Sequence, residues 1–131
     1  MKWFTPILLL LGWPLLAADY MAITGVWRAS IDGLPAIVMT ISDEGDELTG
    51  AILFYMIRRD EGQPPRANPG HPEPLFNMKF DGQTLQFKVS HRRAHGERTA
   101  KDPPVSFRVK LTGPNEGMLG ELRLIRDPAG N

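Results

Sequence analysis

Hydrophobic and polar residues alternate along most of the chain from residue 23 onward. In residues 23–31, the apolar positions are Ile23, Gly25, Trp27, Ala29 and Ile31. A strict period of two residues is typical of a β-strand with one buried face, and no stretch of helical length shows helical spacing. The pattern therefore predicts an all-β protein.

Six further segments show the same period, and each has an apolar face that we expect to point inward. These faces hold Ile37, Met39 and Ile41; Leu48, Gly50, Ile52, Phe54 and Met56; Phe76, Met78 and Phe80; Leu85, Phe87 and Val89; Val105, Phe107, Val109 and Leu111; and Met118, Gly120, Leu122 and Leu124. The Asp81-Gly82 dipeptide predicts a type I′ hairpin. Successive hairpins favour a small antiparallel up-and-down barrel of seven to eight strands, with a β-sandwich as the alternative.

Residues 1–18 have the layout of a secretory signal peptide. Lys2 precedes an apolar run over residues 7–16, which two alanines close. The run is shorter than the roughly 20 apolar residues of a membrane-spanning helix, so a retained anchor is the less favoured alternative. We expect cleavage near Ala18, no stable membrane insertion afterwards, and a secreted or periplasmic product in which residues 19–131 form a single β-barrel domain.

Charge and cysteine content narrow the possible partners and stabilising links. The chain carries 15 Lys+Arg and 15 Asp+Glu, which gives a formal net charge of +0. This balance argues against nucleic acid as a partner, because nucleic-acid-binding domains are usually basic. The chain has no cysteine. A disulfide framework and a lipid-modified cysteine are therefore both excluded.

The Ile-Thr-Gly-Val-Trp sequence at 23–27, followed by Leu-Thr-Gly at 48–50, resembles the first three strands of the calycin superfamily, which groups lipocalins, fatty-acid-binding proteins and avidins. In lipocalins the matching tryptophan closes one end of the barrel beneath an arginine from near the last strand. The resemblance implies that Arg126 stacks on Trp27, because Arg126 shares the parity of the last inward residues. Ala29 stands where avidins carry a polar ligand contact, so biotin is not the expected ligand.

A small barrel is either filled by its own side chains or leaves room for one ligand. The inward phenylalanines and methionines favour a filled core, while a cavity is the alternative. The residues that would line a cavity are Trp27, Met39, Phe54, Met56, Phe76, Met78, Phe87 and Phe107. We expect an exported binding domain, which would take a small apolar or amphipathic ligand into the barrel if the cavity exists.

Residues 58–74 contain five prolines and predict a long loop without a central strand. The strand before the loop is also apolar on its outward parity, at Leu53, Tyr55 and Ile57. Residues 88–101 are basic, with Arg92 and Arg93 at their centre, and are suited to a carboxylate, phosphate or sulfated sugar. The alternative function is therefore an interaction module that binds another exported protein through this loop and the outer face of the third strand.

Motifs of catalysis are missing from the sequence. No serine lies in a Gly-x-Ser-x-Gly context, and no phosphate-binding or dinucleotide-binding fingerprint is present. His91 and His95 have a helical ligand spacing in a segment without helical character, which argues against a metal site. We expect neither an enzyme nor a cofactor.

Overall fold

The computed structural model describes residues 20–90 and 103–128. In this part of the chain a short 3-10 helix, η1 (Tyr20–Ala22), precedes ten strands, and the strand pairings are antiparallel. The strands are β1 (Gly25–Ile31), β2 (Leu34–Asp43), β3 (Leu48–Arg58), β4 (Arg66–Pro69), β5 (Glu73–Pro74), β6 (Phe76–Phe80), β7 (Thr84–Val89), β8 (Val105–Gly113), β9 (Glu116–Leu119) and β10 (Leu122–Arg126). The predicted all-β class is confirmed.

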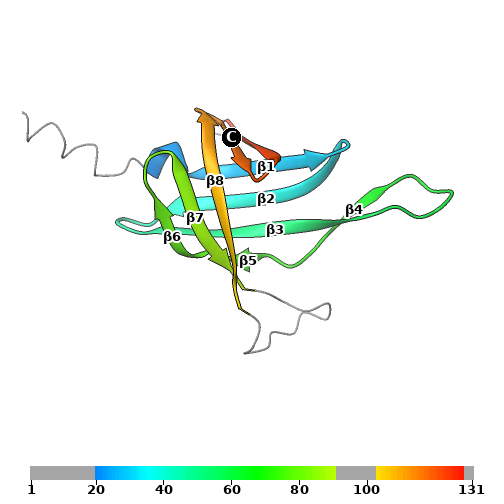
Figure 1. Ribbon diagram of the computed structural model, residues 1–131, viewed down its shortest axis with the longest axis horizontal. Helices are drawn as coiled ribbons and strands as arrows, with labels where there is room; N and C mark the ends of the chain where they lie inside the picture. The colour runs from blue at the N-terminus through cyan, green and yellow to red at the C-terminus, as the bar shows by residue number, and fades with distance from the viewer. Residues whose placement is uncertain (1–19, 91–102, 129–131) are drawn as a thin grey trace, which may run out of the picture.

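The strands form one curled up-and-down sheet (Figure 1). Hydrogen-bonded neighbours follow the order β4-β3-β2-β1-β10-β9-β8-β7-β6, and β5 pairs with β3. Only Leu75 separates β5 from β6, and its N–H donates to the carbonyl oxygen of Gly50 at 2.9 Å. The sheet therefore returns to β3 through this short seam and surrounds a single core. A Cβ on Gly50 would lie 2.6 Å from the Thr40 carbonyl oxygen, so the seam requires glycine there.

The core lies where the alternating pattern predicts it. Its buried apolar residues are Ile23, Trp27, Ala29, Ala36, Ile37, Met39, Ile41, Ile52, Leu75, Phe80, Leu85, Phe87, Val89, Val109 and Leu124. These side chains come from both halves of the curled sheet, because β1–β3 on one side and β6–β8 and β10 on the other contribute to the same cluster. Burial of apolar area is the main favourable term in folding, so this cluster holds the domain together.

The two Asp-Gly hairpins of the structure differ in turn type, and the one that the sequence predicts to be type I′ is not. The Asp81-Gly82 hairpin forms, but its central residues are Gly82 and Gln83, because the Asp81 N–H donates to Thr84 O at 3.2 Å. Only Gly82 has positive φ, at 102°, so the predicted type I′ turn was wrong: that type needs positive φ at both central residues. Asp32 and Gly33, between β1 and β2, do have φ values of 52° and 79°.

The last predicted strand is in fact a hairpin of β9 and β10. The chain turns at Gly120, which shifts the inward parity by one residue. Leu119 therefore packs against the core, whereas Met118, expected to face inward, pairs across with Lys110 and Arg123 on the outer face.

A bulge in β6 puts Phe76 on the outer face, although the alternating pattern predicts that it faces inward. Asn77 has a φ of 51°, and the register between β6 and β7 shifts between Phe76 and Lys79. Phe76 consequently pairs across with Lys88 on the outer face and does not belong to the core, while Met78 does pack against it.

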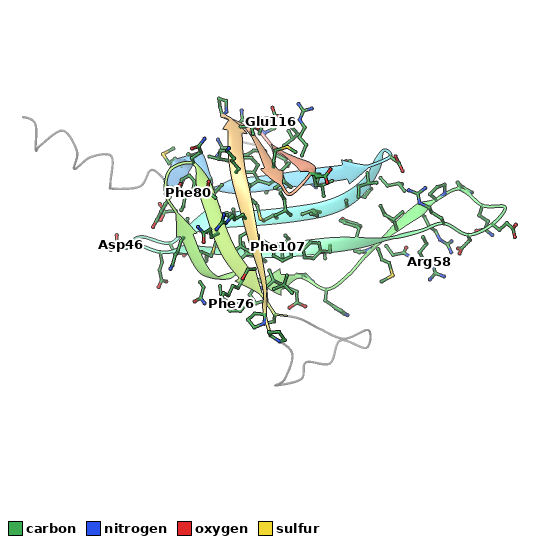
Figure 2. All side chains as sticks on the ribbon, in the orientation of Figure 1. Asp46, Arg58, Phe76, Phe80, Phe107 and Glu116 are labelled. Carbon is green, nitrogen blue, oxygen red and sulfur yellow. The ribbon has the colours of Figure 1, made fainter. Side chains whose placement is uncertain are left out.

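The proline-rich stretch is an arm rather than a structureless loop. β4 pairs with the end of β3, from Tyr55 opposite Pro69 to Arg58 opposite Arg66. The resulting two-stranded ribbon projects beyond the barrel, and Figure 2 shows Arg58 on it, well away from Phe107. β4 is an edge strand, the sheet position that tolerates proline.

Candidate functional site

One end of the barrel is sealed by Trp27 and Arg126. The Trp27 side chain is fully buried, and its indole N–H donates to the Ile23 carbonyl oxygen at 2.9 Å. The Arg126 guanidinium lies over the indole, 5.1 Å from the ring centroid. The predicted stacking of Arg126 on Trp27 is confirmed, and a cation in this position is attracted by the negative face of the ring.

The remaining contacts of Arg126 tie this closed end together. Nη1 donates to the carbonyl oxygens of Met21 at 2.8 Å and Thr24 at 3.0 Å, and Nη2 donates to that of Pro114 at 2.6 Å. Nε donates to Asn115 Oδ1 at 3.0 Å. One side chain thereby joins η1, the start of β1 and the β8–β9 turn, so the arginine serves structure at this end.

The opposite end of the barrel is lined by aromatic rings from three strands. The Phe107 ring centroid lies 5.6 Å from that of Phe87 and 5.8 Å from that of Phe54. Phe87 is buried, whereas Phe54 and Phe107 are half-buried. Such separations are typical of favourable aromatic pairs. The three rings form the floor of this open end.

Two of these rings, Phe54 and Phe107, line a pocket of about 260 Å³, which we call the mouth pocket. It is lined by Phe54, Gly70, His71, Glu73, Val89, Ser90, Val105 and Phe107. The walls are apolar, and the polar groups come from His71, Glu73 and Ser90. An apolar cleft with a few polar groups has the chemistry of a small-molecule site.

Several strand ends position the mouth pocket. Val89 ends β7, Val105 begins β8, and Glu73 begins β5. The Gly70 N–H donates to the Phe54 carbonyl oxygen at 2.9 Å, which fixes the chain between the arm and β5. Glu73 is only 7% exposed and is the buried charged residue among the described parts of the chain. Its carboxylate therefore lies within the barrel wall.

The structure does not gather all the residues predicted to line a ligand cavity. Trp27 and Met39 are fully buried, and Trp27 belongs to the closed end. Phe54, Phe87 and Phe107 come together at the open end. Met78 is half-buried against the core, and Phe76 lies on the outer face. Met56 is 68% exposed on the arm, so its predicted inward position was wrong. The barrel narrows to a ribbon before β3 reaches that residue.

The predicted interaction surface is partly described by the structure. Leu53, Tyr55 and Ile57 are half-buried, opposite Val38, Pro69 and Ala67 respectively. The proline-rich segment thus lies beside the end of this row as a paired strand. Arg92 and Arg93 lie outside the described residues, as do His91 and His95.

Chemical groups in the mouth pocket are not arranged as a catalytic triad. Among the contacts of the described residues, no hydrogen bond joins Ser90 to His71, although a nucleophilic serine needs such a base. Residues 20–90 and 103–128 also contain no group of three side chains suited to hold a metal ion. Within the same residues, no helix has the length and hydropathy needed to cross a membrane.

Among residues 20–90 and 103–128, the carboxyl group with a clearly shifted pKa lies away from the mouth pocket, in the β6–β7 turn. Asp81 Oδ1 accepts hydrogen bonds from the N–H groups of Thr84 at 2.7 Å and Gln83 at 2.9 Å. These bonds favour the charged form and lower the pKa of Asp81 below its ordinary value of 3.8. The two hydrogen bonds stabilise the β6–β7 turn, and Asp81 does not line the mouth pocket.

No protein-family model matches the chain, and no curated protein or solved structure matches it either. The resemblance to calycins therefore stays a prediction, and the candidate site is defined by its own geometry.

The polar residues of the mouth pocket were missed by sequence reasoning. Glu73 stands between Pro72 and Pro74 in the stretch that was expected to be a loop. Its burial depends on the pairing of β5 with β3, which joins residues about twenty positions apart. The sequence signal that points to Glu73 is its position two residues before the apolar pair Leu75 and Phe76, where an alternating segment begins.

Proposed function

We propose that this protein is an exported, non-enzymatic binding domain of the calycin type that takes a small apolar or amphipathic ligand into the mouth pocket. The observation that carries the proposal is an open apolar pocket lined by the paired rings of Phe54 and Phe107, with Phe107 packed in turn against the buried Phe87. The closed end supports the calycin assignment, because Arg126 stacks on Trp27 there as the resemblance implies. Export is supported by the signal-like residues 1–18.

The size of the pocket limits the ligand. Pockets for drug-sized molecules have volumes of roughly 300–1,000 Å³, and an apolar cavity of about 150 Å³ holds benzene. The mouth pocket, at about 260 Å³, lies between these values. It therefore suits a single ring or a short acyl chain, whose polar end would face His71, Glu73 and Ser90.

The test uses hexanol, hexylamine and hexanoate as probes, with binding followed by NMR shifts of the protein amides. We expect saturable shifts at residues 54, 89–90 and 105–107. Val105 is 40% exposed at the mouth, and Val105→Trp should block the pocket and abolish these shifts. Ile125→Trp is the matched control, because Ile125 is 45% exposed on β10 and does not line the pocket. Unsaturable binding, or equal effects of both variants, would contradict the proposal.

The arm favours a second function, the binding of another exported protein. Met56 is 68% exposed on a two-stranded ribbon that extends beyond the barrel, and isolated two-stranded ribbons are only marginally stable in water. A photo-crosslinking residue at position 56 should therefore give a larger adduct in the native compartment. The control is position 21, whose methionine is 76% exposed at the closed end. Equal labelling from both positions would contradict this second function.

A further inference from the structure

The cations of the described residues fall into two groups. Most arginines have partners: Arg28 pairs with Asp127, Arg58 and Arg66 with Asp60, Arg59 with Asp32, and Arg123 with Glu116. Arg126 is held by carbonyl and amide oxygens. Within the described part of the chain, the cations without an ion pair or side-chain hydrogen bond are Lys79, Lys88, Arg108 and Lys110.

These four cations all lie on the outer face of β6–β8. Gln86 on β7 has Lys79 opposite it on β6 and Arg108 opposite it on β8. Lys88 lies two residues further along β7, and Lys110 lies two residues further along β8. Cross-strand partners share a face, so the strand pairings bring the positive charges together.

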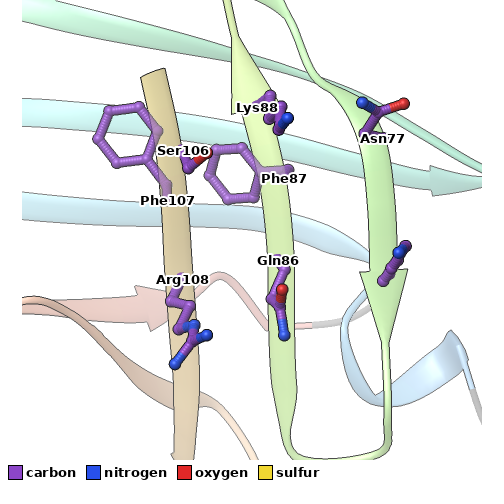
Figure 3. A pocket seen from close by; sticks show the side chains of 8 residues that line it. Asn77, Gln86, Phe87, Lys88, Ser106, Phe107 and Arg108 are labelled. Atoms are coloured by element: carbon purple, nitrogen blue, oxygen red, sulfur yellow. The ribbon is translucent and has the colours of Figure 1, made fainter. Parts of the chain in front are cut away.

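Three of these cations line an open groove of about 640 Å³ (Figure 3). Its lining residues are Asn77, Lys79, Gln86, Phe87, Lys88, Ser106, Phe107 and Arg108. No carboxylate is among them. Uncharged polar side chains lie between the cations and offer both hydrogen-bond donors and acceptors. The groove therefore presents positive charge and hydrogen-bonding groups together.

The groove lacks the features of other recognition surfaces. The two phenylalanines of its lining pack with the barrel core, and only Phe107 is even partly exposed, so the lining lacks the row of exposed rings on which successive nucleobases stack. Protein interfaces have apolar and aromatic centres and are depleted in lysine, which makes an acidic protein a poor match. A ligand rich in anionic groups and hydroxyls fits the lining better.

Backbone spacing indicates a ligand with repeated charges. Adjacent strands lie about 4.8 Å apart, so Lys79 and Arg108, on either side of β7, are separated by roughly 10 Å. Outward residues along one strand repeat about every 6.7 Å. Positive charges at this spacing suit anionic groups distributed along a chain rather than one small anion.

We propose that the outer face of β6–β8 binds an acidic polysaccharide, a sugar chain that carries sulfate or carboxylate groups. Lys79, Lys88 and Arg108 contact the anionic groups, and the Arg108 fork accommodates two oxygens of one group. Asn77, Gln86 and Ser106 hydrogen-bond to the sugar hydroxyls. This surface shares only Phe107 with the lining of the mouth pocket proposed above, and its use does not depend on that function.

The test measures the affinity of a fluorescently labelled, size-defined heparin oligosaccharide by anisotropy. The groove variant is Lys79→Gln, Lys88→Gln and Arg108→Gln together. The matched control, Arg58→Gln, Arg59→Gln and Arg66→Gln, removes the same charge from the arm. Since the groove variant loses three exposed charge contacts at once and each contributes modestly, we expect about a tenfold loss of affinity. The arm variant should change affinity by less than about twofold.

The same experiment identifies the site and the partner class. Amide shifts in the unaltered protein should map to residues 77–79, 86–88 and 106–108, which tests the site even if the groove variant fails to fold. Equal losses in the groove and arm variants would overturn the proposal. The proposal would also be overturned if the groove variant bound heparin fully while a double variant, Arg92→Gln with Arg93→Gln, lost binding. Tighter binding of oligothymidine or polyglutamate than of heparin would overturn it as well.

Discussion

The two ends of the barrel use aromatic residues in opposite ways. At the closed end, the Trp27 indole N–H and the Arg126 guanidinium donate hydrogen bonds to oxygen atoms of the chain, and Arg126 thereby joins three separate segments. At the open end, Phe54 and Phe107 remain half-buried above Phe87 and border a pocket. These side-chain hydrogen bonds are therefore concentrated at the closed end, whereas the open end presents partly exposed rings to a ligand. Separation of this kind is common, because binding regions tend to come from the less stable parts of a fold.

Trp27→Ala is expected to have the largest effect on this comparison. Truncation of a buried aromatic residue costs about 3–5 kcal/mol, which is a large share of the ~5–15 kcal/mol of a typical domain. Urea unfolding of a chain beginning at residue 19 measures the loss. Trp27 is the only tryptophan of that chain, so the unaltered protein should show blue-shifted emission that moves to the red on unfolding. If the native protein showed emission typical of a water-exposed indole, the burial of Trp27 at the closed end would be refuted.

Arg126→Lys should weaken the closed end while keeping its charge. Lysine lacks the planar fork that reaches the carbonyl oxygens of Met21, Thr24 and Pro114 together. We expect a loss of about 2 kcal/mol in the free energy of unfolding, because hydrogen bonds of charged groups contribute roughly 1.5–3 kcal/mol. Arg123→Lys is the control, since Arg123 is exposed and pairs only with Glu116. Similar losses in the two variants would show that Arg126 has no special role.

Phe107→Ala should separate stability from binding. Because Phe107 is half-buried, we expect a loss of about 1–2 kcal/mol, below the range for a fully buried ring. The same variant should abolish the hexanol-induced amide shifts, whereas Arg126→Lys should leave them in place. If Arg126→Lys lost probe binding and Phe107→Ala kept it, the proposed difference between the two ends would be wrong.

The smallest effect concerns Asp81, whose turn lies outside the mouth pocket. Its pKa is lowered in the folded state, so its contribution to stability is present above the ordinary value of 3.8 and is lost as pH falls through the folded value. Asp81→Asn keeps the acceptor oxygen but does not titrate there. The stability difference between the two proteins should therefore change only in the acidic range. A difference that changes near neutral pH would contradict this assignment.

The burial of Trp27 was predictable because it stands in a strand of strict alternation. Its contact with Arg126 was expected from the calycin resemblance, with which the parity of Arg126 agrees. The mouth pocket was not predictable in the same way. Its polar residue Glu73 becomes buried only when β5 meets β3, and the placement of Phe76 depends on the bulge at Asn77. Both events arise from contacts between strands, which alternation within one strand does not encode.

The pairing of β1 with β10 also has a kinetic consequence. Trp27 is opposite Arg126 in this pairing, so the closed end forms only when two segments about a hundred residues apart meet. Contacts of such long sequence separation slow folding, because a large loop must close before they form. A circular permutant that links residue 128 to residue 20 and opens the chain at Gly62, at the exposed tip of the arm, would make this pairing local. Such a molecule should fold faster than the natural order of strands while keeping the same barrel.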